Sequence, residues 1–237
     1  MLTFPFVAFV VPTIGRKTLK NALNSLIEQS DFDWNAFVVS DGIELDPSVR
    51  IDDPRIIYIK TSKKGKLGEN HGNAGKVRNV ALDHDQLRGE WIGFLDDDDT
   101  LLPDYVSNLR QEASNHNSDV IVTRMNHNGN IIPMPGMKDF QKNNVGISFA
   151  AKSHVFKKLG FRFRQTDAED FELLNDFRSS GLLIMISDYV GYHVDGDFKE
   201  TYRANIIKSD KKQCCVYVLC ICIGLIVILG CFHQFQR

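Results

Sequence analysis

The residues best suited to chemistry in this chain are four consecutive aspartates, Asp96–Asp99, which follow the apolar segment Trp91–Leu95. Adjacent carboxylates repel one another, and aspartate has a low strand propensity. A fold tolerates such a cluster most readily where a cation or a hydrogen-bonded ligand offsets the charge. Mg²⁺ and Mn²⁺ prefer oxygen ligands, often one or two carboxylates together with substrate phosphates. The alternative interpretation is a solvated acidic turn in which Asp99 or Thr100 caps the next helix.

The elements that must position this run alternate between strands and helices. Apolar segments predict strands at 6–11, 36–40, 56–60, 91–95, 120–125 and 182–187. Helical spacing of apolar residues and loop signals predict helices at 18–28, 76–85, 103–115, 154–159 and 169–179. Alternating βα units with continuous apolar strands predict an α/β fold whose mainly parallel sheet is covered on both faces.

Three polar segments are expected to meet at one edge of that sheet. Pro12–Thr13, Asp41–Gly42 and Asp96–Asp99 each follow a predicted strand, and ligands of such sheets bind beyond the carboxyl ends of the strands. Two segments look irregular: a Gly- and Asn-rich loop at 63–75, and a hairpin or long loop at 126–144.

Several common ligand classes are excluded by the sequence. A phosphate-loop motif ending at Gly75-Lys76 would need a glycine where Asn70 stands and Ser or Thr where Val77 stands. The turn Pro12–Arg16 lacks the glycine pattern of a dinucleotide fold. The net charge of −2 gives no electrostatic case for nucleic-acid binding. The domain is therefore expected to bind its ligand with side chains, a metal and ordinary backbone amides.

The end of the chain has a different composition. All five cysteines lie beyond residue 213, so the preceding domain has no disulfide framework and no thiolate site. Residues 214–232 carry no charge and would span roughly 28 Å as a helix, close to the thickness of bilayer hydrocarbon. We therefore expect a domain at 1–207, a basic linker at 208–213, a transmembrane helix at 214–232 and a short tail at 233–237. The lysines in the linker predict a tail-anchored protein with a cytosolic domain.

An ordered set of motifs resembles the family-2 glycosyltransferases and covers nearly all of residues 4–200. The strongest part is Gly75-Lys-Val-Arg-Asn-Val-Ala-Leu82 followed by Gly89–Asp99. The others are Val11–Arg16, Val38–Gly42, Leu102–Asp104 and Glu169–Phe171. The resemblance implies a single glycosyltransferase-A domain, an inverting reaction and a nucleotide-sugar donor.

The resemblance also implies residues that bind the nucleotide. Asp41 would accept a hydrogen bond from uracil N3–H, which favours UDP or dTDP, and Arg78 would face the nucleotide. Lys76 would add charge near the diphosphate, and Thr13 lies at the same predicted edge. The alternatives are a turn aspartate before Gly42, a surface salt bridge for Arg78 and a solvated lysine.

Within the aspartate run, the resemblance assigns Asp98 to a bound Mn²⁺ or Mg²⁺ and Asp96 to the ribose or the outer shell of the metal. Asp97 is grouped with the nucleotide-binding residues, but its identity is expected to be incidental. Asp99 is a supporting group or a helix cap. The metal would bridge the diphosphate oxygens and stabilise the departing nucleotide.

An acidic pair and one histidine complete the implied site. Direct displacement at an anomeric carbon needs a base to take the proton of the acceptor hydroxyl. Asp170 is assigned this role, with Glu169 as the alternative, while an ordinary acidic first turn of a helix would leave both without one. His193 would be a third metal ligand or a diphosphate contact, or else structural.

The sequence thus predicts a metal-dependent, inverting glycosyltransferase that moves a single sugar from a nucleotide-sugar donor to an acceptor hydroxyl. The anchor indicates a membrane-associated acceptor or simply an address. The acceptor, whether a glycan, a lipid-linked molecule or a protein, stays open, and residues 126–144 are expected to shape its choice. Two other functions remain: a nucleotidyltransferase of related fold, and a catalytically silent tail-anchored adaptor.

Overall fold

The structure is a computed structural model that describes residues 4–62 and 73–194. Most of the predicted loop at 63–75 lies outside the described residues, as do the predicted linker, transmembrane helix and tail at 208–237. Within the two described ranges, none of the helices combines the length and the hydrophobicity of a membrane span.

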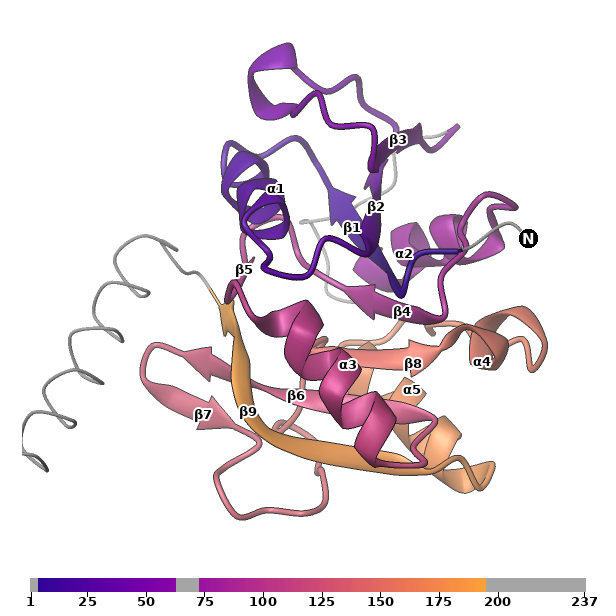
Figure 1. The fold of residues 1–237 in the computed structure, drawn as a ribbon. Coiled ribbons are helices and arrows are strands. Elements are labelled where there is room, and N and C mark those ends of the chain that lie inside the picture. The colour runs from indigo at the N-terminus through magenta and orange to yellow at the C-terminus, as the bar shows by residue number, and fades with distance from the viewer. Residues whose placement is uncertain (1–3, 63–72, 195–237) are drawn as a thin grey trace, which may run out of the picture. The chain divides into compact units, whose positions relative to one another are not determined.

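One mixed sheet forms the centre of the described domain (Figure 1). Its strands lie in the order β3-β2-β1-β4-β8-β6-β9-β5, and β7 adds to β6. The strands are β1 (Val7–Thr13), β2 (Trp34–Ser40), β3 (Ile56–Lys60), β4 (Trp91–Phe94), β5 (Thr100–Leu101), β6 (Val120–His127), β7 (Asn130–Ile132), β8 (Phe149–Lys152) and β9 (Ile184–Val194).

The first half of the sheet follows the sequence prediction. β1 pairs in parallel with both β2 and β4, and β2 pairs in parallel with β3. All seven residues of β1 are buried, as expected for a central parallel strand with helices on both faces. The carboxyl ends of β1, β2 and β4 therefore lie at one edge: Thr13 is the last residue of β1, and Asp41 and Asp96 come directly after β2 and shortly after β4.

The prediction of a mainly parallel sheet is wrong for the second half. β8 runs antiparallel to both β4 and β6, and β5 runs antiparallel to β9. Only β6 and β9 pair in parallel there. Three short strands carried no usable periodicity in the sequence: β5 has two residues, β7 three and β8 four.

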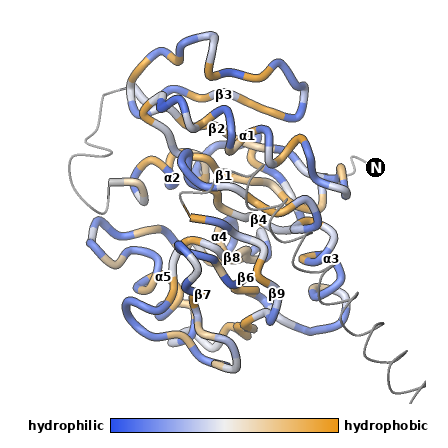
Figure 2. Tube along the Cα trace, turned by 90° about the vertical axis from the view of Figure 1, so that its left-hand side faces the viewer, coloured by the Kyte–Doolittle hydropathy of each residue, from blue (hydrophilic) through white to orange (hydrophobic). Residues whose placement is uncertain are grey.

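Helices cover both faces of the sheet. They are α1 (Leu19–Ile27), α2 (Asn73–Asp83), α3 (Tyr105–Asn115), α4 (Ser153–Lys157) and α5 (Glu169–Ser179), with a short 3₁₀ turn at Pro47–Val49. Seen edge-on, α2 and α5 lie on one side of the sheet and α1 and α3 on the other (Figures 1 and 2). Since α2 and α5 share a face, their first turns can meet above the sheet.

Apolar spacing explains how the helices dock. In α1 the residues Leu19, Ala22, Leu23 and Leu26 are buried, which is the i, i+3, i+4, i+7 pattern of a helix with one apolar stripe. Hydrophobic segments gather toward the middle of the domain in Figure 2.

Phe94, the last residue of β4, sits at the centre of an aromatic cluster directly below the aspartate run. Its ring centroid lies 5.2 Å from that of Phe149, 5.8 Å from Phe156 and 5.1 Å from Phe163. Tilted and edge-to-face pairs of this kind add to the energy of burial. The cluster joins β4 to β8 and α4, and so supports the strand that carries the run.

We expect Phe94→Ala to lower the free energy of unfolding by about 3–5 kcal/mol, because the cavity would remove contacts with three rings. Urea unfolding followed by far-UV circular dichroism measures this change. Phe32→Ala is the control, since Phe32 is 68% exposed, and it should shift stability by no more than about 0.5 kcal/mol. Equal effects of the two substitutions would contradict the central place of Phe94.

Candidate active site

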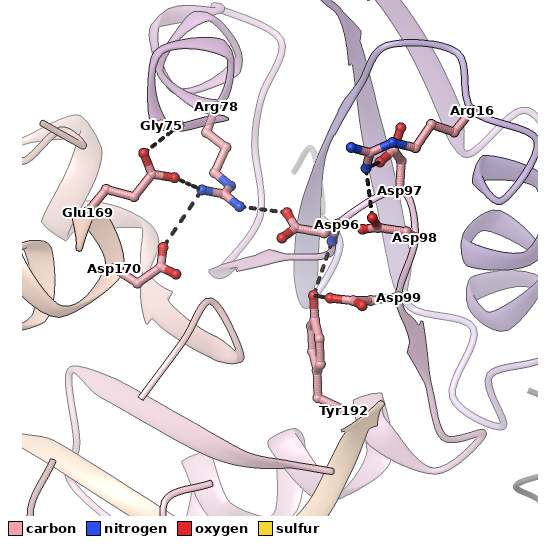
Figure 3. Close-up of polar contacts among 10 residues, drawn as sticks. All are labelled: Arg16, Gly75, Arg78, Asp96, Asp97, Asp98, Asp99, Glu169, Asp170 and Tyr192. Carbon is pink, nitrogen blue, oxygen red and sulfur yellow. Dashed lines mark hydrogen bonds and ion pairs between the residues drawn. The ribbon is translucent and has the colours of Figure 1, made fainter. Parts of the chain in front are cut away.

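The aspartate run turns away from the sheet at the end of β4, and the phenol of Tyr192 on β9 anchors it. The Tyr192 hydroxyl donates to Asp99 Oδ2 at 2.7 Å and accepts from the backbone N–H of Asp96 at 3.1 Å (Figure 3). Burial, followed by the Asp99 carboxylate, raises the pKa of Tyr192, so the phenol stays neutral. The helix-cap interpretation of Asp99 or Thr100 is wrong, because α3 begins only at Tyr105.

Asp97 has defined structural contacts, so the expectation that its identity is incidental is wrong. Its carboxylate is 3% exposed. Thr13 Oγ1 donates to Asp97 Oδ2 at 2.6 Å, and Arg16 donates to Asp97 Oδ1 at 2.8 Å. Burial raises the pKa of Asp97, and these two contacts oppose the shift. Both Asp97 and Thr13, predicted as nucleotide-binding residues, hold the first loop of the domain against the run.

Arg16 also contacts the predicted metal ligand. The same Nη1 group that bonds Asp97 donates to Asp98 Oδ2 at 2.7 Å. The Asp98 side chain is 36% exposed, so its carboxylate borders solvent while that of Asp97 does not. Arg16 belongs to one of the motifs of the resemblance, but the sequence analysis assigned it no role, because nothing in the local pattern links it to residues 81 and 82 positions away.

The guanidinium of Arg78 on α2 is the centre of the second half of the site. It is 2% exposed, and it contacts three carboxylates from two other elements (Figure 3). Nη2 bonds Asp96 Oδ1 at 2.5 Å, Nη1 bonds Glu169, and Nη1 lies 3.7 Å from Asp170 Oδ1. The surface-salt-bridge interpretation of Arg78 is therefore wrong.

Electrostatics keep this arginine charged. Burial lowers the pKa of Arg78, but the charges of Asp96, Asp170 and Glu169 together raise it above its ordinary value. A buried cation without partners would be strongly destabilising. The three carboxylates therefore make the burial of Arg78 possible, and Arg78 in turn holds them together.

The two members of the acidic pair have different environments. Glu169 uses both oxygens: one accepts from Arg78, and the other accepts from the backbone N–H of Gly75 at 3.0 Å. Asp170 Oδ1 accepts no hydrogen bond from any residue that the structure describes. The Glu169 side chain on α5 is thus held against the first turn of α2 by both of its oxygens, whereas Asp170 has one oxygen available for another hydrogen bond.

Gly75 allows this close approach. A Cβ at this position would lie 2.7 Å from Glu169 Oε2 and 2.7 Å from Phe163 Cβ. Any larger residue would push α2 away from α5 and separate Arg78 from the acidic pair.

The environment of Asp170 suits a proton acceptor. Burial, reinforced by the Asp96 and Glu169 charges and opposed by Arg78, raises the pKa of Asp170 to about 7. A general base works best when its pKa lies near the operating pH. Burial also raises the pKa of Glu169, against the Arg78 charge and the Gly75 hydrogen bond, but its oxygens are already engaged.

Of the remaining residues predicted for the site, Asp41 and His193 lie at or near the edge of the sheet that carries the aspartate run, and Lys76 does not. Asp41 is 4% exposed, and its backbone N–H donates to the Thr13 carbonyl at 3.0 Å. His193 is 4% exposed and pairs in the β5–β9 ladder with Thr100. Lys76 is exposed, and residues two apart on a helix do not face each other, so it lies away from the Arg78 cluster.

His193 has an unused nitrogen. Burial lowers its pKa, which favours the neutral imidazole. Its Nε2 atom is buried and has no hydrogen-bond partner among the residues that the structure describes. A neutral imidazole with a free lone pair is the form that binds metal ions or accepts a hydrogen bond.

The carboxylates fit a magnesium- or manganese-type ion that takes only part of its ligands from the protein. In the described ranges, no group of three or more His, Cys, Asp or Glu side chains is placed to hold a metal. Asp96 and Asp98 are 31% and 36% exposed, and hard cations commonly take one or two carboxylates plus waters and substrate phosphates. Asp98 would hold such an ion, with Asp96 in its outer shell.

A second buried arginine, which the sequence did not single out, shapes the irregular segment after β7. Arg124 on β6 is 1% exposed. It donates to the carbonyls of Pro133 at 2.6 Å, Met134 at 2.7 Å and Met137 at 3.0 Å, and to Asp188 at 3.0 Å. The predicted hairpin or long loop at 126–144 is thus a short hairpin followed by a loop held by one guanidinium.

The same loop docks on the helix that carries the acidic pair. Phe140 is buried, and its ring lies 6.1 Å from that of Phe171, the residue after Asp170. Arg178 on α5 pairs with Asp139 at 3.0 Å. The loop therefore packs against α5, the helix that carries the candidate base.

The raised pKa of Asp170 predicts a pH-dependent loss of stability. The folded protein keeps the carboxyl proton up to about pH 7, whereas the unfolded chain releases it near pH 3.8. Between these two pH values the folded state binds more protons than the unfolded chain. The contribution of the Asp170 carboxyl to the free energy of unfolding is therefore greatest below about pH 4 and falls as the pH rises to about 7. Asp170→Asn lacks this titration, so its stability relative to wild type should increase from about pH 4 to about pH 7. Urea unfolding across that range measures the difference, and parallel curves would contradict the assignment.

Comparison with known proteins identifies the family. The model of the family "Glycosyl transferase family 2" matches residues 8–179. The poly(ribitol-phosphate) beta-N-acetylglucosaminyltransferase TarS of Staphylococcus aureus is 33% identical over 134 residues, which make up 55% of this chain and 23% of TarS. The GalNAc(5)-diNAcBac-PP-undecaprenol beta-1,3-glucosyltransferase of Campylobacter jejuni is 35% identical over 116 residues, 46% of this chain and 35% of that enzyme.

The fold is also that of a solved relative. The crystal structure of S. aureus TarS 1-349 in complex with UDP-GlcNAc superposes with a TM-score of 0.63 at 22% identity, covering 80% of this chain and 58% of that one. The matched segments make up well under two thirds of the length of both TarS and the C. jejuni enzyme. Since the family model matches residues 8–179, which are well over half of the chain, the chain belongs to glycosyl transferase family 2.

Proposed function

We propose that this protein transfers a single N-acetylglucosamine from UDP-GlcNAc to a hydroxyl group, with inversion at the anomeric carbon. One observation carries the proposal: Arg78 contacts both Asp96 of the aspartate run and the candidate base Asp170, so the proposed donor site and the proposed proton acceptor adjoin the same side chain. TarS, named for N-acetylglucosaminyl transfer and solved with UDP-GlcNAc, supports the choice of donor.

Asp41 is proposed to recognise the uracil. It lies at the end of β2, on the edge shared with the run, and it is buried, so a base placed there would be shielded from water. A carboxylate accepts from the N3–H of uracil and discriminates against bases that lack a donor at that position.

The carboxylate of Asp98, with Asp96 beside it, is proposed to bind Mn²⁺ or Mg²⁺ together with the diphosphate. Such an ion supplies positive charge that stabilises the nucleotide as it departs. His193 is a further candidate ligand or diphosphate contact, because its buried Nε2 has no partner in the described part of the chain.

Asp170 is proposed to take the proton of the attacking hydroxyl. An inverting displacement requires the nucleophile on the face of the sugar opposite the leaving group. Asp170 lies on α5 and Asp98 after β4, with Arg78 and Asp96 between them (Figure 3), so the base and the metal site are proposed to flank the sugar. Glu169 would position Arg78 and α2 rather than act as the base, since both its oxygens are engaged.

The proposed acceptor is a polyol-phosphate polymer, by analogy with the poly(ribitol-phosphate) in the name of TarS. The C. jejuni relative is named for a lipid-linked saccharide, and that acceptor class is the alternative. The loop held by Arg124 is proposed to contribute to acceptor choice, because it docks on α5, the helix that carries Asp170. A nucleotidyltransferase and a silent adaptor are disfavoured by the family match and by the intact acidic pair.

Donor turnover tests the proposal most simply. UDP-GlcNAc, UDP-glucose, UDP-GalNAc and GDP-mannose are each tested as the donor, and release of the nucleoside diphosphate is measured. Release should be fastest from UDP-GlcNAc with Mn²⁺ and should stop when EDTA removes the ion. Asp98→Ala should lower turnover by about a hundredfold or more. Asp170→Asn should keep UDP affinity but lower transfer to an acceptor by about 10²–10⁴-fold.

Asp33→Asn is a matched control, because Asp33 is an exposed aspartate paired with Arg110, and it has no contact with the site. It should turn over donor like the wild type. Full activity of Asp98→Ala would refute the assignment of the metal and diphosphate site. Transfer of a nucleotide rather than a sugar would establish the alternative reaction.

We further propose that residues 214–232, which carry no charge, anchor the protein in a membrane with the domain in the cytosol. The full chain expressed in cells should stay in the membrane pellet after alkaline carbonate extraction, and a chain ending at residue 207 should be released. Extraction of the full chain by carbonate would contradict the anchor.

A further inference from the structure

Arg16 contacts the aspartate run at the place where the proposed function requires a cation. One guanidinium nitrogen bridges two carboxylates, Asp97 Oδ1 at 2.8 Å and Asp98 Oδ2 at 2.7 Å. The nitrogen therefore already supplies positive charge to the carboxylate assigned to the metal. This raises the question of how a divalent ion and Arg16 share Asp98.

The first loop of the domain is built to deliver Arg16 to this position. Thr13 Oγ1 accepts from the backbone N–H of Gly15 at 2.9 Å and donates to Asp97 at 2.6 Å. Gly15 has φ +79°, and a Cβ there would lie 3.0 Å from the Ile43 side chain. The positive φ favours glycine here, and the turn brings the next residue, Arg16, to the run.

The two carboxylates differ in how firmly they bind the arginine. Asp97 is 3% exposed and has both oxygens engaged, by Thr13 and Arg16. Asp98 is 36% exposed, so water or an ion can replace Arg16 there at little cost. Arg16 itself is 39% exposed. Asp97 is therefore the permanent partner of Arg16, and Asp98 is the exchangeable one.

A divalent ion on Asp98 would lie close to the guanidinium, within roughly 5 Å given metal–oxygen distances near 2.1 Å. Like charges at this separation repel one another. A nucleotide diphosphate brings negative charge that compensates both cations, so the repulsion is relieved only when the ion and the diphosphate bind together.

We propose that Arg16 is a built-in counter-ion of Asp98 that opposes binding of a divalent cation alone and so couples cation binding to nucleotide binding. This rests on the proposed function for the identity of the nucleotide, but it concerns a separate quantity, the affinity for the ion in the absence of nucleotide. In the nucleotide-free protein Arg16 bridges Asp97 and Asp98. When the ion and the diphosphate enter, Arg16 keeps Asp97 and releases Asp98.

The test measures Mn²⁺ binding to the full chain by electron paramagnetic resonance of free Mn²⁺, with and without UDP. Wild-type protein should bind Mn²⁺ weakly alone and more tightly with UDP. Arg16→Gln should bind Mn²⁺ alone about fivefold more tightly, a change of the size that a partly exposed ion pair can supply. It should also show a smaller gain on adding UDP, because the repulsion that the diphosphate relieves is absent without the Arg16 charge.

Two further variants separate charge from structure. Arg16→Lys keeps the positive charge and should bind Mn²⁺ alone within about twofold of the wild type. Arg110→Gln is the matched control, because Arg110 is 40% exposed and also bridges two carboxylates, Asp31 and Asp33, on contacts that do not involve the run. It should leave both Mn²⁺ affinities unchanged, and thermal unfolding checks that all variants are folded.

The possible outcomes are distinct. Tighter Mn²⁺ binding by Arg16→Gln alone, with wild-type behaviour of Arg16→Lys and Arg110→Gln, supports the proposal. Unchanged or weaker Mn²⁺ binding by folded Arg16→Gln, in a protein whose wild type binds Mn²⁺ and UDP together, overturns the proposal and leaves the proposed function standing. If the wild type binds neither Mn²⁺ nor UDP, the proposed function fails and the coupling fails with it.

Discussion

A guanidinium shared by three carboxylates is the interaction on which this site depends. Arg78 comes from α2, Asp96 from the end of β4, and Glu169 and Asp170 from the first turn of α5. Removing a charged group from water is costly unless partners surround it, and removal of one partner of such a cluster usually costs several kcal/mol. The contact therefore fixes three elements relative to one another, and Gly75 makes the fit possible because a side chain there would collide with Glu169.

The antiparallel half of the sheet explains how α5 reaches this contact. β8 pairs with β4 and β6 in the reverse direction, and α4 follows it directly. The chain then returns on the α2 side of the sheet (Figure 1) and begins α5 with Glu169 and Asp170, which contact Arg78. Acidic residues in the first turn of α5 also interact favourably with the helix dipole. The helix-turn interpretation of Glu169 and Asp170 is thus compatible with the site interpretation, since the same residues serve the helix and the cluster.

Much of the first half of the domain could be predicted from the sequence. Continuous apolar strands and one-sided helices have strong periodicities, and the rule that ligands bind at carboxyl ends brought Thr13, Asp41 and Asp96 to one edge. The sequence could not indicate β5 and β8, which are too short to show a period, or the reversal of direction that β8 brings. It allowed a hairpin at 126–144 but did not locate the three residues of β7. The contacts of Arg16 and Arg124 also escaped prediction, because a long side chain gives no local signal of the distant carboxylate or carbonyl that it will reach. The difference between Glu169 and Asp170 required the geometry, since adjacent acidic residues look alike in a sequence until their partners are known.

The central proposal for this protein is that the sugar donor binds between the carboxylates of the aspartate run and the candidate base Asp170. A crystal structure of the protein with UDP-GlcNAc and Mn²⁺ tests this most directly. We expect the diphosphate beside Asp98, the uracil against Asp41, and the anomeric carbon of the sugar between the diphosphate and Asp170. A nucleotide bound away from the aspartate run, or a sugar whose free face meets a closed wall instead of Asp170, would contradict the claim.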